Sequence, residues 1–177
     1  MRRVVSSSVV ALAVLVTSVV VLPRRAHAEG GPFGLGLIVG SPTGLSMKYY
    51  LGESGQAIDA ALGAAFIGAD GLHAHADYLW HPFLLTDDPA FSLPLHFGVG
   101  VRVLSHDRGR DDSDDDVHLG VRVPVGLTFD FKEIPLDAFF EVAVIVDFHG
   151  DHALNNNDES DHVDLDINAG VGARYYF

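Results

Sequence analysis

Apolar and polar residues alternate with a period of two over most of the chain after residue 29. The clearest stretch is Val117–Phe131, in which every odd position holds Val, Leu or Phe and the even positions hold polar, charged or small residues. Successive side chains of a β-strand point to opposite sides of a sheet, so this pattern predicts a strand with one apolar and one polar face.

Similar alternation recurs in other segments, and it predicts eight strands in all. The expected strands are Gly34–Gly40, Gly44–Leu51, Gln56–Phe66, Leu72–His81, a strand beginning at Leu93, Val117–Phe131, a strand beginning at Leu136, and Val163–Phe177. Short connections rich in Gly or Pro predict hairpins at Ser41–Gly44, Gly52–Gly55 and Lys132–Pro135. Three connections are longer, namely Pro82–Ser92 and the acidic stretches Ser105–Asp116 and Gly150–His162. Consecutive strands joined in this way give an antiparallel meander.

The first 28 residues have the composition of a secretory signal peptide. Two arginines precede an apolar run from Val4 to Leu22, and the small-x-small sequence at residues 26–28 is a site of the kind that signal peptidase cleaves. An uncleaved transmembrane anchor is the alternative. We therefore expect a signal peptide over residues 1–28 and a single barrel domain over residues 29–177.

Composition limits the functional classes. The chain has no cysteine, which excludes a disulfide framework, a thiolate zinc site and a cysteine nucleophile. Its net charge of −13 argues against a nucleic-acid binder, which would carry a basic patch. The 28 N-terminal residues contain four arginines and no acid, so the remaining chain is more acidic still.

The polar face of the predicted strands decides which kind of barrel they form. A lipocalin-like barrel would point its apolar face inward, whereas an outer-membrane barrel points it toward lipid. Here the polar face is dominated by glycine, mixed with a few ionisable groups, which suits a narrow interior filled by large side chains rather than a solvated surface. Aromatic residues that would form a girdle near the strand ends are Tyr49, Tyr78, Trp80, Phe129 and Tyr175. We predict an all-β fold, a single eight-stranded antiparallel up-and-down transmembrane β-barrel with a polar, side-chain-filled lumen.

Four stretches carry a family resemblance: GLIVGSPTGLSMKYYL (36–51), LHAHADYLWH (72–81), VRVPVGLTFDF (121–131) and NAGVGARYYF (168–177). The chain resembles the small bacterial outer-membrane barrels of the OmpA/OmpX type, and more closely an uncharacterised family of eight-stranded outer-membrane barrels first noticed in spirochaetes. The terminal Gly172, Tyr175 and Phe177 look like the strand signal that such proteins present to the barrel assembly machinery. The resemblance implies a location in the bacterial outer membrane with both termini in the periplasm, and it supplies no activity.

The charged residues of the polar face are expected to pair inside the lumen, because an unpaired buried charge is costly. The predicted network comprises Lys48, Asp59, Asp77, Arg102, Arg122, Glu141, Asp147 and Arg174, with Asp164 and Asp166 nearer the outside. A proton or ion path through these groups is the alternative, although eight strands leave no wide channel.

Two groups of residues are candidate metal ligands. His73, His75 and Asp77 share one strand face at a spacing that suits zinc, and His96 could add a ligand from the next strand. The alternative is a hydrogen-bonded lumen cluster. Acidic residues of the two long connections, which suit weakly bound divalent cations, are Asp112, Asp114, Asp115, Asp116, Asp158 and Asp161. No other cofactor is expected.

Three functional hypotheses follow. The first is a non-enzymatic integral barrel, monomeric, in contact with outer-membrane lipid and lipopolysaccharide, whose acidic loops face outward in an envelope structural or surface-interaction role. The second is an outer-membrane lipid-modifying enzyme, for which Ser46 and Ser92 are the strand-associated serines and no catalytic residues are assigned. The third is a soluble periplasmic barrel that binds an apolar ligand. The sequence favours the first.

Overall fold

The computed structural model describes residues 30–52, 55–65, 71–106, 116–148 and 163–177. It contains eight strands: β1 (Phe33–Gly40), β2 (Thr43–Tyr50), β3 (Gln56–Ala65), β4 (Gly71–Asp87), β5 (Phe91–His106), β6 (Asp116–Phe131), β7 (Leu136–Phe148) and β8 (Val163–Tyr176). None of these residues belongs to a helix with the length and hydropathy needed to cross a membrane. The predicted signal peptide, residues 1–28, lies outside the described residues.

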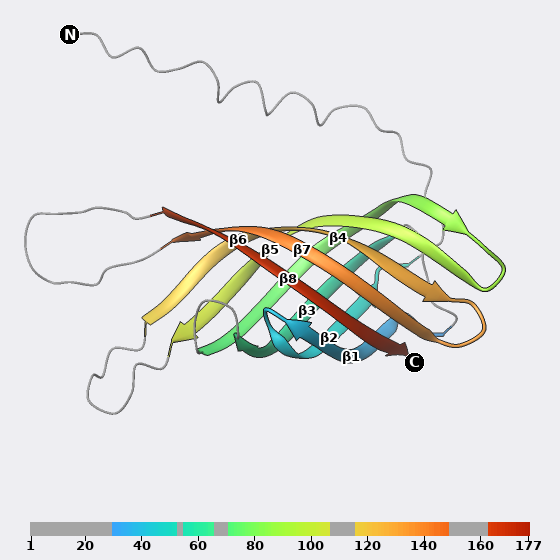
Figure 1. Ribbon diagram of the computed structural model, residues 1–177, viewed down its shortest axis with the longest axis horizontal. Helices are drawn as coiled ribbons and strands as arrows, with labels where there is room; N and C mark the ends of the chain where they lie inside the picture. Colours follow the sequence, from blue (N-terminus) through green and yellow to red (C-terminus); the bar gives the residue numbers. More distant parts are fainter. Residues whose placement is uncertain (1–29, 53–54, 66–70, 107–115, 149–162) are drawn as a thin grey trace, which may run out of the picture.

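The strands form one closed antiparallel barrel, in which each strand pairs with its neighbours in sequence and β8 pairs with β1. Closure is made by seven register pairs, from Gly34–Tyr176 to Gly40–Gly170. Figure 1 shows that the hairpins β2–β3, β4–β5 and β6–β7 and the C-terminus lie at one end of the barrel. The strands that flank the two acidic stretches end at the opposite end, which we call the loop end. The predicted eight-stranded meander is confirmed.

The expected long connection at Pro82–Ser92 is wrong. Strand β4 continues to Asp87 and β5 begins at Phe91, so only residues 88–90 separate them. Pro82 interrupts the alternation, and the pairing of β4 with β5 shifts register between Trp80 and Phe83 and again between Leu84 and Asp87. A strand that absorbs extra residues in this way loses its period-two pattern, so the sequence looks like a loop although the hairpin continues.

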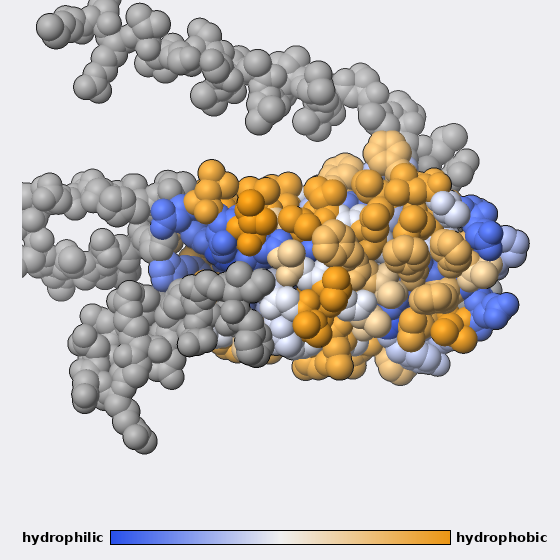
Figure 2. Space-filling model, in the orientation of Figure 1, coloured by the Kyte–Doolittle hydropathy of each residue, from blue (hydrophilic) through white to orange (hydrophobic). Residues whose placement is uncertain are grey.

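The two faces of the strands have opposite character. Leu, Val, Ile, Phe and Tyr side chains point outward along all eight strands, and the most exposed are Leu165, Phe177 and Ile167, at 76%, 66% and 65%. Figure 2 shows these apolar residues over the middle of the barrel wall, with hydrophilic residues at the end that carries the short hairpins. Every lysine or arginine that is buried points inward, as do six buried carboxylates. The apolar face is therefore the outer face, as predicted.

Candidate functional site

Three arginines cross the lumen of the barrel, and each contacts two carboxylates from different strands. Arg174 of β8 contacts Asp59 and Asp137, Arg122 of β6 contacts Asp77 and Glu141, and Arg102 of β5 contacts Asp147 and Asp166. Strand β7 supplies one carboxylate to each set. We call these sets the inner, central and outer bridges, in order from the hairpin end to the loop end. Together the three bridges connect the six strands from β3 through β8 across the interior.

The inner bridge is fully enclosed. The Arg174 guanidinium donates through Nη1 to Asp59 and through Nε to Asp137 Oδ1 at 3.2 Å, and it stacks on the ring of Phe139 at 3.9 Å. The hydroxyl of Tyr176 donates to Asp137 Oδ2 at 2.7 Å. Both oxygens of Asp137 therefore accept from Arg174 Nε, and Oδ2 also accepts from Tyr176, so this buried carboxylate is satisfied.

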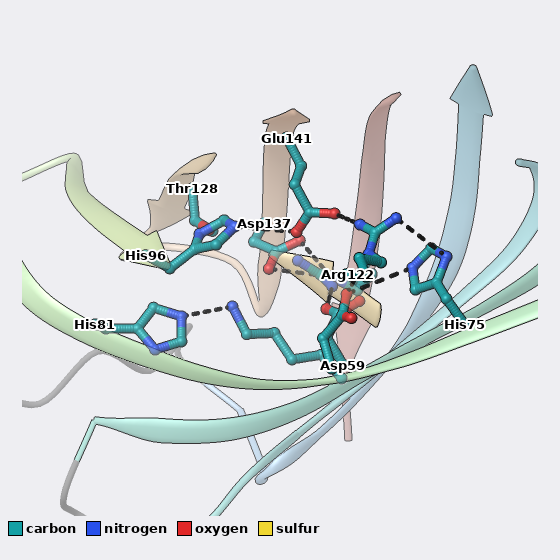
Figure 3. Close-up of polar contacts among 11 residues, drawn as sticks. Asp59, His75, His81, His96, Arg122, Thr128, Asp137 and Glu141 are labelled. Atoms are coloured by element: carbon teal, nitrogen blue, oxygen red, sulfur yellow. Dashed lines mark hydrogen bonds and ion pairs between the residues drawn. The ribbon is translucent and has the colours of Figure 1, made fainter. Parts of the chain in front are cut away.

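The central bridge is distinguished by imidazoles. Arg122 Nε donates to Asp77 Oδ2 at 2.8 Å and Nη2 donates to Glu141, while Nη1 lies 3.5 Å from His75 Nδ1 (Figure 3). His96 contacts the other oxygen of Glu141 at 3.3 Å and Thr128 Oγ1 at 3.3 Å. A buried guanidinium thus contacts two carboxylates and one imidazole, and a second imidazole contacts one of those carboxylates.

The outer bridge opens toward solvent. Arg102 donates to Asp147, to Asp166 Oδ2 at 2.6 Å and to Asn168 Oδ1 at 3.3 Å. Arg102 itself is 2% exposed, whereas the Asp166 side chain is 47% exposed. Water at the loop end therefore reaches one partner of this bridge but not the guanidinium.

Glycines on intervening strands make room for these contacts. Gly100 pairs in register with Asp77 on one side and Arg122 on the other, and Gly120 stands in the same way between Arg102 and Asp147. A Cβ atom on Gly100 would lie 1.9 Å from Asp77 Oδ1. Each ion pair therefore joins two strands that are not neighbours, across a third strand that has no side chain there. This agrees with the sequence argument that large polar groups need small neighbours in a narrow lumen.

Lys48, a member of the predicted charge network, contacts an imidazole. It faces Asp59 in register between β2 and β3, but its Nζ lies 2.8 Å from His81 Nε2. His81 Nδ1 lies 2.8 Å from the carbonyl oxygen of Gly55, so Nδ1 carries the proton and Nε2 accepts from the ammonium. Asp59 pairs instead with Arg174.

The predicted histidine cluster is brought together in part. His73 and His75 lie side by side, with Nε2 and Nδ1 3.4 Å apart, and His75 Nε2 is 3.8 Å from Asp77 Oδ2. His75, Asp77 and Glu141 each offer a ligand atom within 4.8 Å of the others, and all three are buried. Glu141, which the sequence placed in the charge network, is thus the third member of this set, while His96 lies against Glu141 rather than beside His73.

Other candidates are placed as follows. Ser46 is fully buried and its Oγ has no hydrogen-bond partner among the described residues. Tyr175 and Phe177 of the expected assembly signal point outward with their rings in contact at 5.1 Å, and Gly172 faces the lumen. The acidic residues Asp112, Asp114, Asp115, Asp158 and Asp161 lie outside the described residues, and Asp116 is the first residue of β6.

The predicted charge network is incomplete. Alternation places Thr128, Asp130 and Asp137 on the polar face, but the predicted network omits them, and it also omits His81 and Tyr176. Asp166, predicted nearer the outside, has a side chain that is 47% exposed and pairs with Arg102. Asp130 and Asp137 flank the β6–β7 hairpin and oppose each other in register. Because they share the phase of Thr128 and Glu141, alternation places both on the polar face, and this position is the signal that they belong to the charge network.

Comparisons of the chain with protein-family models, with curated proteins and with solved structures find no match.

Proposed function

We propose that this chain is a non-enzymatic integral barrel of the bacterial outer membrane, whose lumen is closed by an internal ion network. One observation carries this proposal: the wall is apolar outside and charged inside. A barrel in water needs the reverse arrangement, because charged groups gain from hydration and apolar groups from burial.

The apolar side chains of the outer wall support the proposal that the barrel contacts lipid. Each strand presents large apolar residues outward, and such a continuous exposed apolar surface far exceeds the patches that monomeric soluble proteins tolerate. In lipid the same surface is matched to its surroundings, and a Lys or Arg at the bilayer midplane would cost about 2–4 kcal/mol. The closed barrel also leaves no unpaired strand edge between β1 and β8 over the paired residues.

Orientation follows from the two ends of the barrel. The C-terminus and the described start of the chain, at Gly30, lie at the hairpin end. In the outer membrane this end would face the periplasm, and the acidic connections at the loop end would face outward, where they meet lipopolysaccharide and its divalent cations. The barrel assembly machinery would be the partner during insertion.

The interior supports a structural role over a transport role. Eight strands enclose a space that side chains can fill, and here the three arginine bridges span it at three levels. An ionised lumen is also unsuited to an apolar ligand, which argues against the soluble ligand-binding alternative.

Fractionation of cells that produce the full chain tests the proposal. We expect the protein in outer-membrane fractions, with migration in detergent gels that changes on boiling as a folded barrel unfolds. Variants with Val121→Asp and Val123→Asp on the lipid face should reduce insertion, whereas Ala143→Gly, which changes the lumen face, should insert normally. Folded, monodisperse protein in buffer without detergent would contradict the proposal.

A further inference from the structure

The central bridge contains more potential metal ligands than an arginine–carboxylate ion pair needs. The inner and outer bridges each consist of one arginine and two carboxylates, and no imidazole contacts either arginine among the described contacts. The central bridge adds His75 beside Arg122 and His96 beside Glu141, with His73 3.4 Å from His75. Imidazole with carboxylate is the ligand set of zinc and related divalent transition metals.

Two atoms of this cluster have no hydrogen-bond partner in the part of the chain that the structure describes. They are Oδ1 of Asp77, which is 2% exposed, and Nδ1 of His73, which is fully buried. Buried polar atoms of folded proteins are almost always satisfied, so unsatisfied ones point to a missing ligand, ion or water.

The charges of the lumen point the same way. The buried cations are Lys48, Arg102, Arg122 and Arg174, and the buried carboxylates are Asp59, Asp77, Asp130, Asp137, Glu141 and Asp147. Asp166, the half-exposed partner of Arg102, adds a further carboxylate, so carboxylates outnumber cations in the lumen. A divalent cation would reduce this excess.

We propose that the lumen binds a divalent transition metal of the zinc class at His75, Asp77 and Glu141, with His73 and His96 as adjacent donors. The three ligand atoms lie within 4.8 Å of one another, from β4 and β7. Figure 3 shows the Arg122 guanidinium between His75 and Glu141, where it supplies positive charge to the same carboxylates in the metal-free protein. The metal then neutralises Asp77 and Glu141, which Arg122 alone leaves with one uncompensated charge. This inference does not depend on the proposed membrane location.

Zn²⁺ titration of the chelator-treated full chain, folded in detergent and followed by calorimetry, tests the site. We expect one Zn²⁺ per chain, with affinity lowered at least tenfold by His75→Asn and by Asp77→Asn. His81→Gln, which changes a buried histidine outside the cluster, should leave the affinity within about twofold of the wild type. Replacing Zn²⁺ with Co²⁺ should give the visible absorption bands of a Co²⁺ ion bound by nitrogen and oxygen ligands.

A second variant separates the lumen from the acidic connections, because its substitutions lie outside the eight strands. It carries Asn at positions 112, 114, 115, 158 and 161, and its affinity for Zn²⁺ should equal that of the wild type. Loss of binding in this variant would overturn the proposal, even if the lumen variants fail to fold. So would unchanged binding in His75→Asn and Asp77→Asn, the absence of binding in the wild type, or binding that appears only after Arg122→Gln.

Discussion

Arg102 and Asp147 form an ion pair across Gly120, which stands between them on β6 and pairs in register with both. The contact joins β5 to β7 through the interior rather than along the sheet. Asp77 and Arg122 repeat this arrangement across Gly100, from β4 to β6. The glycines of the inner face are therefore matched to particular ion pairs.

Gly120→Ala should destabilise the barrel. The added Cβ would lie 2.2 Å from Asp147 Oδ1 and 2.9 Å from Ile145 Cγ2, so the carboxylate must move away from Arg102. We expect a loss of about 1–3 kcal/mol in the free energy of unfolding, as for other overpacked sites. Urea unfolding in detergent measures it, with Val121→Ala on the outer face of the same strand as the control. An equal loss in both variants would show that the contact across Gly120 has no special role.

Arg122→Met should be far more costly than the loss of a surface ion pair. Arg122 is 2% exposed and its removal leaves Asp77 and Glu141 buried with no cation. Breaking a buried pair in this way costs about 3–5 kcal/mol, whereas an exposed pair is worth about 0–1 kcal/mol.

Lys132→Ala provides the comparison. Lys132 Nζ lies 2.5 Å from Asp87 Oδ1, but the two side chains are 36% and 60% exposed. The same urea experiment should separate the two variants clearly. If Arg122→Met were no less stable than Lys132→Ala, the central bridge would not support the fold.

Tyr176→Phe and Tyr175→Phe compare the two faces at the end of β8. Tyr176 is 2% exposed and donates its hydroxyl to Asp137, whereas Tyr175 points outward. Removing the hydroxyl of Tyr176 leaves a buried carboxylate with one donor fewer, so we expect a loss of about 1–3 kcal/mol in unfolding free energy. Tyr175→Phe should change it little. A reversed order would mean that the faces of β8 are assigned wrongly.

The fold could be predicted from the sequence because one signal, alternation, runs through nearly every strand. Most outward positions, such as Val121, are apolar and most inward ones, such as Arg122, are polar or small, although Ile38, Phe139 and Ile145 also point inward. The wrong prediction of a long connection at Pro82–Ser92 has a local cause, since two register shifts break the alternation without ending the strand.

The members of the lumen network could be predicted better than their pairing. Strand phase places Arg174 and Asp59 inside, but they are 115 residues apart, and their contact depends on the stagger of strands around a closed barrel. Alternation carries no information about that stagger. For the same reason Lys48 appeared to be a partner for the acids, although its ammonium contacts His81.

The filled lumen predicts very low ion permeability. Arginine bridges cross the interior at three levels, and an eight-stranded barrel has no aqueous channel of useful width. Purified protein in planar bilayers should give no long-lived open channels. Stable, porin-sized conductance steps from the wild-type chain would contradict a closed lumen.

Fluorescence quenching of Trp80 by brominated lipid tests the central claim, that the apolar face of the barrel contacts hydrocarbon. Trp80 is the only tryptophan of the chain, and it packs on the outer face against Tyr78 and Phe97, with ring centroids 4.8 and 5.8 Å away. We predict strong quenching in vesicles of brominated lipid relative to vesicles of the unbrominated lipid. Unquenched emission from folded protein in those vesicles would contradict the orientation on which the account depends.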